Sequence, residues 1–155
     1  MSTISSQCVD EIVERLNESS GRPTGLEPVI RGRRSWPTDD EQVAGKAWAL
    51  VFSGKNALEK LDANGLTKLN LFQVKVVIMG VGDTSTPAEV VIDPVRAWCT
   101  KQLDGKRLPD LAEEVEEVED GEVEYAVKSK NPVCRQINTF VVHHTSRIGD
   151  AELRY

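Results

Sequence analysis

The chain has 155 residues and a net charge of −6, from 19 Lys and Arg against 25 Asp and Glu. This length suits one domain around a single core, and the acidic balance argues against a protein that wraps a nucleic-acid backbone, which needs clustered basic side chains. Apolar residues make up 39% and aromatic residues 5%, which is too apolar for a disordered chain and thin for a self-sufficient monomer. Contacts between subunits are therefore expected to bury part of the apolar surface.

The first predicted element is an amphipathic helix over residues 4–19. The sequence Ser19-Ser20-Gly21 followed by Pro23 ends it. Residues 22–46 are predicted to form an irregular loop that contains a short strand at Val29 and Ile30. The apolar residues of the helix recur three or four positions apart and so share one face: Ile4, Cys8, Val9, Ile12, Val13 and Leu16.

Two strands are predicted after this loop. Residues 47–52 are a short apolar run between Gly45 and Gly54, which is typical of a buried strand. Residues 66–79 alternate between two faces and form the clearest strand. We expect the two strands to pair antiparallel, with a brief helical excursion over 56–61.

Two further helices are predicted in the second half of the chain. Asp93 and Pro94 are suited to the N-cap and the first position of a helix, whose apolar stripe contains Trp98. A third helix is predicted over 108–118 because Leu108, Leu111, Val115 and Val118 recur at helical spacing.

The remaining residues predict a closing hairpin. Residues 123–127 and 133–143 read as strands joined by a turn at Asn131-Pro132, and residues 146–155 are expected to be a flexible tail. The order of elements predicts a single α+β domain over 1–155. Its antiparallel or mixed β-sheet would carry two to three helices packed on one face.

The residue pattern offers little for catalysis. The three cysteines are far apart with no CxxC, so we expect buried free thiols in a reducing cytoplasm. His143 and His144 are neighbours on a strand and should point to opposite faces near its exposed end, which prevents them from chelating one metal. We predict no catalytic residue, no metal site and no cofactor, and no apolar run is long enough for a membrane span.

Two clusters of opposite charge are the candidate interface. The acidic run 113–124 includes Glu113, Glu116 and Glu117, and the basic segment contains Arg31, Arg33 and Arg34 with Trp36. An acidic edge and a basic loop on one chain could meet head to tail in a ring. The alternatives are a solvated helix face and a solvated loop, or a small metal-dependent enzyme that uses the 113–124 carboxylates.

The order of elements resembles the tail terminator proteins of long-tailed bacteriophages, the lambda-type minor tail family. The segments that carry the likeness are the opening helix (ISSQCVDEIVERLNESS), the long strand (KLNLFQVKVVIMGVG), the helix with Trp (DPVRAWCTKQL), the Leu-Pro segment (RLPDLAEEVEE) and the closing hairpin (VEYAVKSK, CRQINTFVVHHT). No functional residue is carried over, because the likeness is one of order and not of a fixed motif. The loop at 22–46 and the chain past His144 are longer than the family pattern.

The resemblance implies a structural virion protein of the tail or neck, assembled in the host cytoplasm, with no enzymatic activity. Such a subunit would form a homo-oligomeric, six-membered ring on the head-proximal end of the tail tube. The ring would stop tube polymerisation and meet the tail tube protein and the head-completion or neck proteins. DNA would pass through it without sequence-specific binding. A head–tail connector or tail-completion subunit of the neck is the alternative that shares these features.

Overall fold

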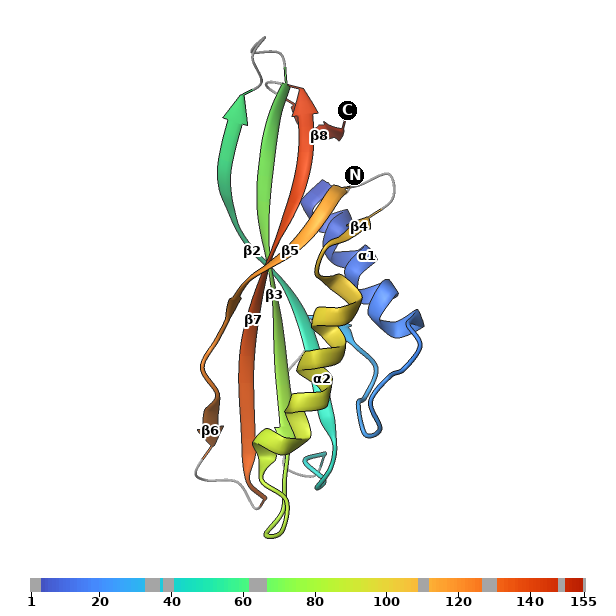
Figure 1. Ribbon diagram of the computed structural model, residues 1–155, viewed down its shortest axis with the longest axis vertical. Coiled ribbons are helices and arrows are strands. Elements are labelled where there is room, and N and C mark those ends of the chain that lie inside the picture. Colours follow the sequence, from blue (N-terminus) through green and yellow to red (C-terminus); the bar gives the residue numbers. More distant parts are fainter. Residues whose placement is uncertain are drawn as a thin grey trace.

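The computed structural model describes residues 4–32, 37, 41–61, 67–108, 112–126, 131–147 and 150–154 (Figure 1). Two helices lie in these ranges, α1 (Ile4–Glu18) and α2 (Ala88–Leu103). The strands are β1 (Ile30–Arg31), β2 (Ala47–Leu61), β3 (Thr67–Val81), β4 (Lys106–Leu108), β5 (Ala112–Asp120), β6 (Glu124–Ala126), β7 (Val133–Arg147) and β8 (Asp150–Arg154).

All strands belong to one mixed sheet. Its order is β1-β2-β3-β7-β5-β4, with β6 and β8 also paired to β7. Only the pairing of β1 with β2 is parallel; the other strand pairs are antiparallel. The predicted α+β class is therefore confirmed, as is the antiparallel pairing of the strands that begin at residues 47 and 67.

The register of the three central strands sets the two faces of the sheet. Val76 of β3 lies opposite Val51 of β2 and Asn138 of β7. Directly opposed residues share a face, so the even-numbered residues of β3 all point to the same side. That side is the main core, where Phe72, Val74, Val76 and Ile78 are buried.

Both helices cover this face (Figure 1). The stripe predicted for the first helix is confirmed, since Cys8, Val9, Ile12 and Leu16 are at most 1% exposed. Trp98 of α2 is 6% exposed, and its Nε1–H donates to the Ser20 carbonyl at 3.1 Å, which ties α2 to the chain just after α1.

The third predicted helix is wrong. Residues 112–120 form β5, in which Val115 lies opposite Val142 and is fully buried while Glu114 and Glu116 are exposed. Leu108 is buried in β4, which pairs antiparallel with β5. The helical spacing arose because apolar residues of two short strands happen to fall three or four positions apart. The described part of the chain therefore has two helices, at the lower end of the predicted range.

Two predicted boundaries also differ from the structure. Residues 56–61 continue β2 and are not helical. Helix α2 begins at Ala88 and holds Pro94 inside it. The helix can start this early because Gly80 lets it lie close to β3: a Cβ at Gly80 would stand 2.5 Å from Cγ2 of Ile92.

The histidines and the chain end bring further differences. His143 and His144 do lie on opposite faces, but His144 is fully buried and stacks on Phe72 with ring centroids 5.7 Å apart. Its predicted surface position is wrong because β7 extends past it to Arg147, beyond the predicted end of the strand. In the segment expected to be a flexible tail, residues 150–154 pair with β7 as β8. Neither described helix is long and apolar enough to cross a membrane.

Candidate functional site

The structure places Arg31 of the predicted basic segment and the predicted acidic run on opposite sides of the sheet. Arg31 ends β1 at one edge, while Glu113, Glu116 and Glu117 lie in β5 near the other. Strands β2, β3 and β7 separate them. The other predicted basic-segment residues, Arg33, Arg34 and Trp36, fall outside the described residues. Within one chain, Arg31 and the acidic strand β5 do not contact each other. A head-to-tail contact between neighbouring subunits requires this separation.

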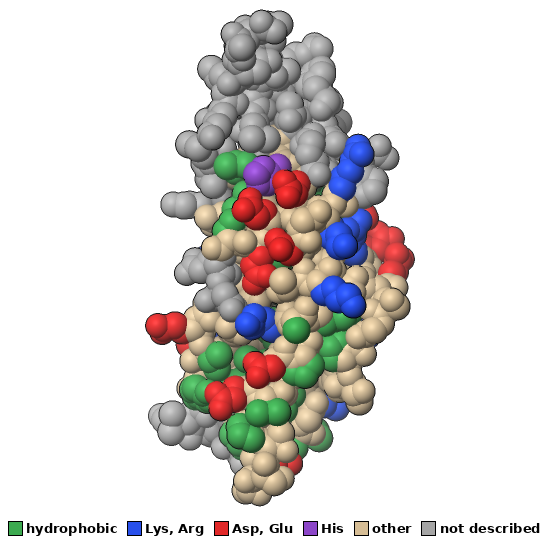
Figure 2. Space-filling model, viewed as in Figure 1, with side chains coloured by type: hydrophobic (Ala, Val, Ile, Leu, Met, Phe, Trp, Pro, Cys, Tyr) green, Lys and Arg blue, Asp and Glu red, His purple; other side chains and the backbone are tan. Residues whose placement is uncertain are grey.

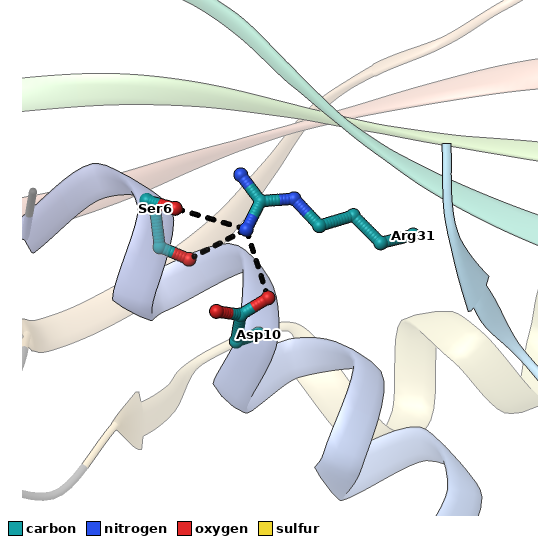
Figure 3. A network of polar contacts seen from close by, with 3 residues as sticks. All are labelled: Ser6, Asp10 and Arg31. Atoms are coloured by element: carbon teal, nitrogen blue, oxygen red, sulfur yellow. Dashed lines mark hydrogen bonds and ion pairs between the residues drawn. The ribbon is translucent and has the colours of Figure 1, made fainter. Parts of the chain in front are cut away.

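Arg31 already has partners within its own chain. Its Nη1 contacts Asp10 Oδ1 at 2.8 Å and donates to Ser6 Oγ at 2.9 Å, so the side chain holds β1 to α1 (Figure 3). The side chains of Arg31 and Asp10 are 41% and 60% exposed. A solvent-exposed pair of this kind contributes at most about 1 kcal/mol, so a partner's carboxylate could compete with Asp10 for the guanidinium.

The acidic run alternates between the faces of the sheet. Glu116 lies on the face away from the helices, where its Oε2 is 3.3 Å from Nε2 of His143. Glu114 lies directly opposite His143 on the same face. Glu117 points to the helix side and accepts from Thr100 Oγ1 at 2.7 Å. Among the described residues, no group of three His, Cys, Asp or Glu side chains could hold a metal ion.

The three cysteines are free and buried, as predicted. Burial, helped by the charge of Glu117, raises the pKa of the Cys99 thiol to about 12. Burial and the carboxylates of Glu89 and Asp93 raise the pKa of Cys134 to about 11. A nucleophilic thiolate requires a lowered pKa and access to solvent, so the environments of these two thiols suit core packing.

Among the described residues, the outer edge of β2 is open over much of its length. Strand β1 pairs only with Leu50 and Val51, and Gly32 N–H donates to the Val51 carbonyl at 2.7 Å. From Phe52 to Leu61, no described strand lies on this outer side. A hollow of about 200 Å³ marks the point where β1 ends, lined by Arg31, Gly32, Val51, Phe52 and Ser53.

Sequence reasoning missed this edge because the apolar run stops at Phe52. The residues that follow contain glycine, two lysines and a glutamate, which carry no strand pattern by themselves. Their backbone is held as strand by β3, with register shifts between Ser53 and Asn56 and between Asn56 and Glu59. The length of β2 is thus a property of the β2–β3 pairing and not of local sequence.

Comparison with known proteins finds a likeness among solved structures. No family model matches the chain, and no curated protein sequence matches it. Among solved structures, a chain of the "Virion of native gene transfer agent (GTA) particle" is similar at 12% identity with a TM-score of 0.46. The match covers 85% of this chain and 91% of that one. The likeness concerns the path of the backbone. The role of the GTA chain in its particle belongs to that chain and is not carried over to this protein.

Proposed function

We propose that this protein is a structural subunit of a phage-like particle that associates edge to edge into a closed ring. In its specific form, the proposal is a tail terminator, whose ring caps the head-proximal end of the tail tube. The observation that carries it is the open outer edge of β2 from Phe52 to Leu61. The order of elements in the sequence, which resembles the tail terminator family, supplies the specific assignment.

An open edge of this length favours association. Unpaired backbone N–H and C=O groups along an edge strand are a template for a strand of another chain. The opposite end of the sheet is different, because the three-residue strand β4 forms it and Asp104 Oδ1 accepts from the backbone N–H of Glu117 at 2.8 Å. A contact between the β2 edge of one copy and the opposite edge of the next is heterologous, and a heterologous contact that closes on itself gives a ring, whereas pairing of two β2 edges would give a two-fold dimer.

The charge of the chain fits a ring through which DNA passes. Each subunit carries a net charge of −6, so a ring of such subunits repels a phosphate backbone instead of binding it. This supports passage of DNA without sequence-specific contacts. In this proposal the neighbours of the ring are the tail tube protein on one side and the head-completion or neck proteins on the other.

The test is light scattering across a concentration series, with negative-stain images of the same fractions, alone and with preformed tail tubes. We expect a ring of about six subunits with a central hole, in solution or on the tube end. Hydrogen exchange of the 52–61 amides should slow in the ring relative to the monomer. A strict monomer that binds neither tubes nor heads contradicts the proposal, whereas binding to heads but not to tubes favours the connector alternative.

A further inference from the structure

The two helices present different outward surfaces. Among the α1 side chains that the structure describes, residues 6–18, the exposed ones are all polar: Asp10, Glu14, Asn17 and Glu18. On α2 the exposed residues include Val90, Pro94 and Ala97, which recur at helical spacing and form an apolar stripe opposite the buried one. Val90 is 50% exposed. A surface helix is expected to be polar on its outer side, so this stripe on α2 needs a partner to explain it.

The stripe continues onto β6 and has an acidic border. Tyr125 is 57% exposed, and its hydroxyl donates to the carboxylate of Glu89 in the first turn of α2. Asp93 lies one turn further along the helix and is also exposed. We call this surface the acidic–apolar patch; it consists of Glu89, Val90, Asp93, Pro94, Ala97 and Tyr125. Figure 2 shows hydrophobic and acidic side chains mixed over the lower half of this face.

Pro94 interrupts the backbone hydrogen bonding of α2 inside the patch. Proline has no N–H, so the helical hydrogen bond from position 94 to the carbonyl of Val90 is not made. The patch combines exposed apolar side chains with the carboxylates of Glu89 and Asp93, which together suit a partner with Arg or Lys beside apolar side chains.

The chain carries a basic surface of its own at the other end of α2. We call Arg15, Lys101, Lys106 and Arg107 the basic group. Arg15 Nη2 donates to the Arg107 carbonyl at 2.9 Å, which brings α1 and β4 together. Lys101, Lys106 and Arg107 are exposed, and within the described part of the chain none of them makes an ion pair. Basic side chains run along one side of the face in Figure 2.

We propose that the acidic–apolar patch of one copy docks on the basic group of the next copy, and that this contact sets the subunit order in the ring. The proposal rests on the proposed function and adds a contact between copies to the one at the open edge of β2. Figure 1 draws β6 and the start of α2 at one end of the molecule and β4, beside the end of α2, toward the other. Because each group meets a different group on the next copy, the contact can run head to tail, as a ring requires. Opposite charge steers the encounter and disfavours arrangements in which two acidic patches or two basic groups meet.

Cross-linking tests the contact directly. A Val90→Cys, Arg107→Cys double variant, oxidised with copper–phenanthroline, should give a ladder of cross-linked species that ends at the closed ring. Each single variant can link only to the same position on another copy, so it should stay mostly uncrosslinked. The native thiols do not interfere because all three are buried. Strong dimers from Val90→Cys alone would show face-to-face association and overturn the proposal.

Charge reversal gives an independent test. Asp93→Arg and Arg107→Glu should each weaken assembly by about tenfold or more, because like charges then face each other. The combined variant should recover most of the loss. Glu14→Arg, the same type of change on the polar face of α1, is the matched control and should leave assembly unchanged. Val90→Ser should weaken assembly without altering the circular dichroism spectrum.

The outcomes separate this inference from the proposed function. If the wild-type chain forms rings and Asp93→Arg, Arg107→Glu and Val90→Ser all assemble equally well, the interface proposal is wrong while the ring stands. If Asp93→Arg leaves self-assembly intact but abolishes binding to preformed tubes, the patch docks a tube protein and the proposed contact between copies is wrong. If the wild-type chain forms no ring with or without tubes, both proposals fail.

Discussion

Replacing Trp98 with alanine should be among the most damaging single changes in this protein. Trp98 is 6% exposed in the core between α2 and the sheet, and it donates to the Ser20 carbonyl. A buried Trp covers about 150–250 Å², worth about 4–6 kcal/mol at about 25 cal/mol per Å², of which alanine keeps a part. Large-to-small changes of this kind cost about 3–5 kcal/mol, and the lost hydrogen bond contributes about 1 kcal/mol.

We therefore expect the free energy of unfolding to fall by about 4 kcal/mol. For a domain of this size that lowers Tm by about 8–16 °C. The assay is urea unfolding followed by far-UV circular dichroism, because the chain has three Trp residues and fluorescence would report a mixture. Trp98→Phe is the control: it keeps an aromatic ring in the core but not the donor, so it should cost about 1–2 kcal/mol.

A decrease in the free energy of unfolding of less than about 1 kcal/mol for Trp98→Ala would refute the reasoning. Removing a side chain this buried costs more than that unless the core collapses to fill the space. It would mean that α2 is not anchored to the sheet through Trp98. A loss as large for Trp98→Phe as for Trp98→Ala would instead show that the bond to Ser20 dominates over packing.

Four further predictions concern other residues. Asn138 is fully buried, and its side-chain amide has no hydrogen-bond partner among the described residues. Asn138→Leu should therefore raise the free energy of unfolding, measured in urea, by about 1–3 kcal/mol. A decrease in the free energy of unfolding would instead indicate that a bound water satisfies the amide. The thiols of Cys8, Cys99 and Cys134 should not react with a thiol reagent at pH 8 in the native protein and should all react in urea. Hydrogen bonds from the backbone N–H groups of Thr86 and Ser85 lower the pKa of Asp83. The ionised Asp83 carboxylate therefore stabilises the fold fully above the ordinary pKa of Asp, and this stabilisation is lost as the pH falls through the lowered pKa. The difference in unfolding free energy between wild type and Asp83→Ala should disappear in strong acid and persist at pH 7. Millimolar Mg²⁺, Mn²⁺ or Ca²⁺ should leave Tm unchanged, and a rise would favour the enzyme alternative that uses the 113–124 carboxylates.

The elements that were predictable from sequence are those whose pattern is local. Helix α1 was predicted at 4–19 and spans Ile4–Glu18, because one long apolar stripe and a Ser-Ser-Gly ending define it. The predicted strand at 66–79 matches β3 at Thr67–Val81 for the same reason, since alternation persists over many residues. Here local periodicity and tertiary burial agree.

The elements that were missed depend on distant partners. The residues of β5 are held in strand conformation by their pairing with β7. Their own sequence does not predict a strand, because the row of glutamates has no apolar alternation beyond Val115. The early start of α2 depends on the close approach to Gly80, which is visible only once β3 is in place. Of the candidate site, the sequence predicted two charge clusters, but the separation of Arg31 from the acidic strand β5 follows from the strand order alone.

The position of β7 in the sheet has a consequence for how the chain reaches this fold. Its register pairs Thr67 with Arg147 and Val81 with Val133, so the centre of the sheet joins segments that are far apart in sequence. Contacts of long sequence separation slow folding, because loop closure comes before the contacts that reward it. During synthesis β3 is made well before its partner and has an uncovered inner edge until residues 133–147 have left the ribosome. A chain cut before Val133 should therefore aggregate, because β3 then keeps an unpaired edge.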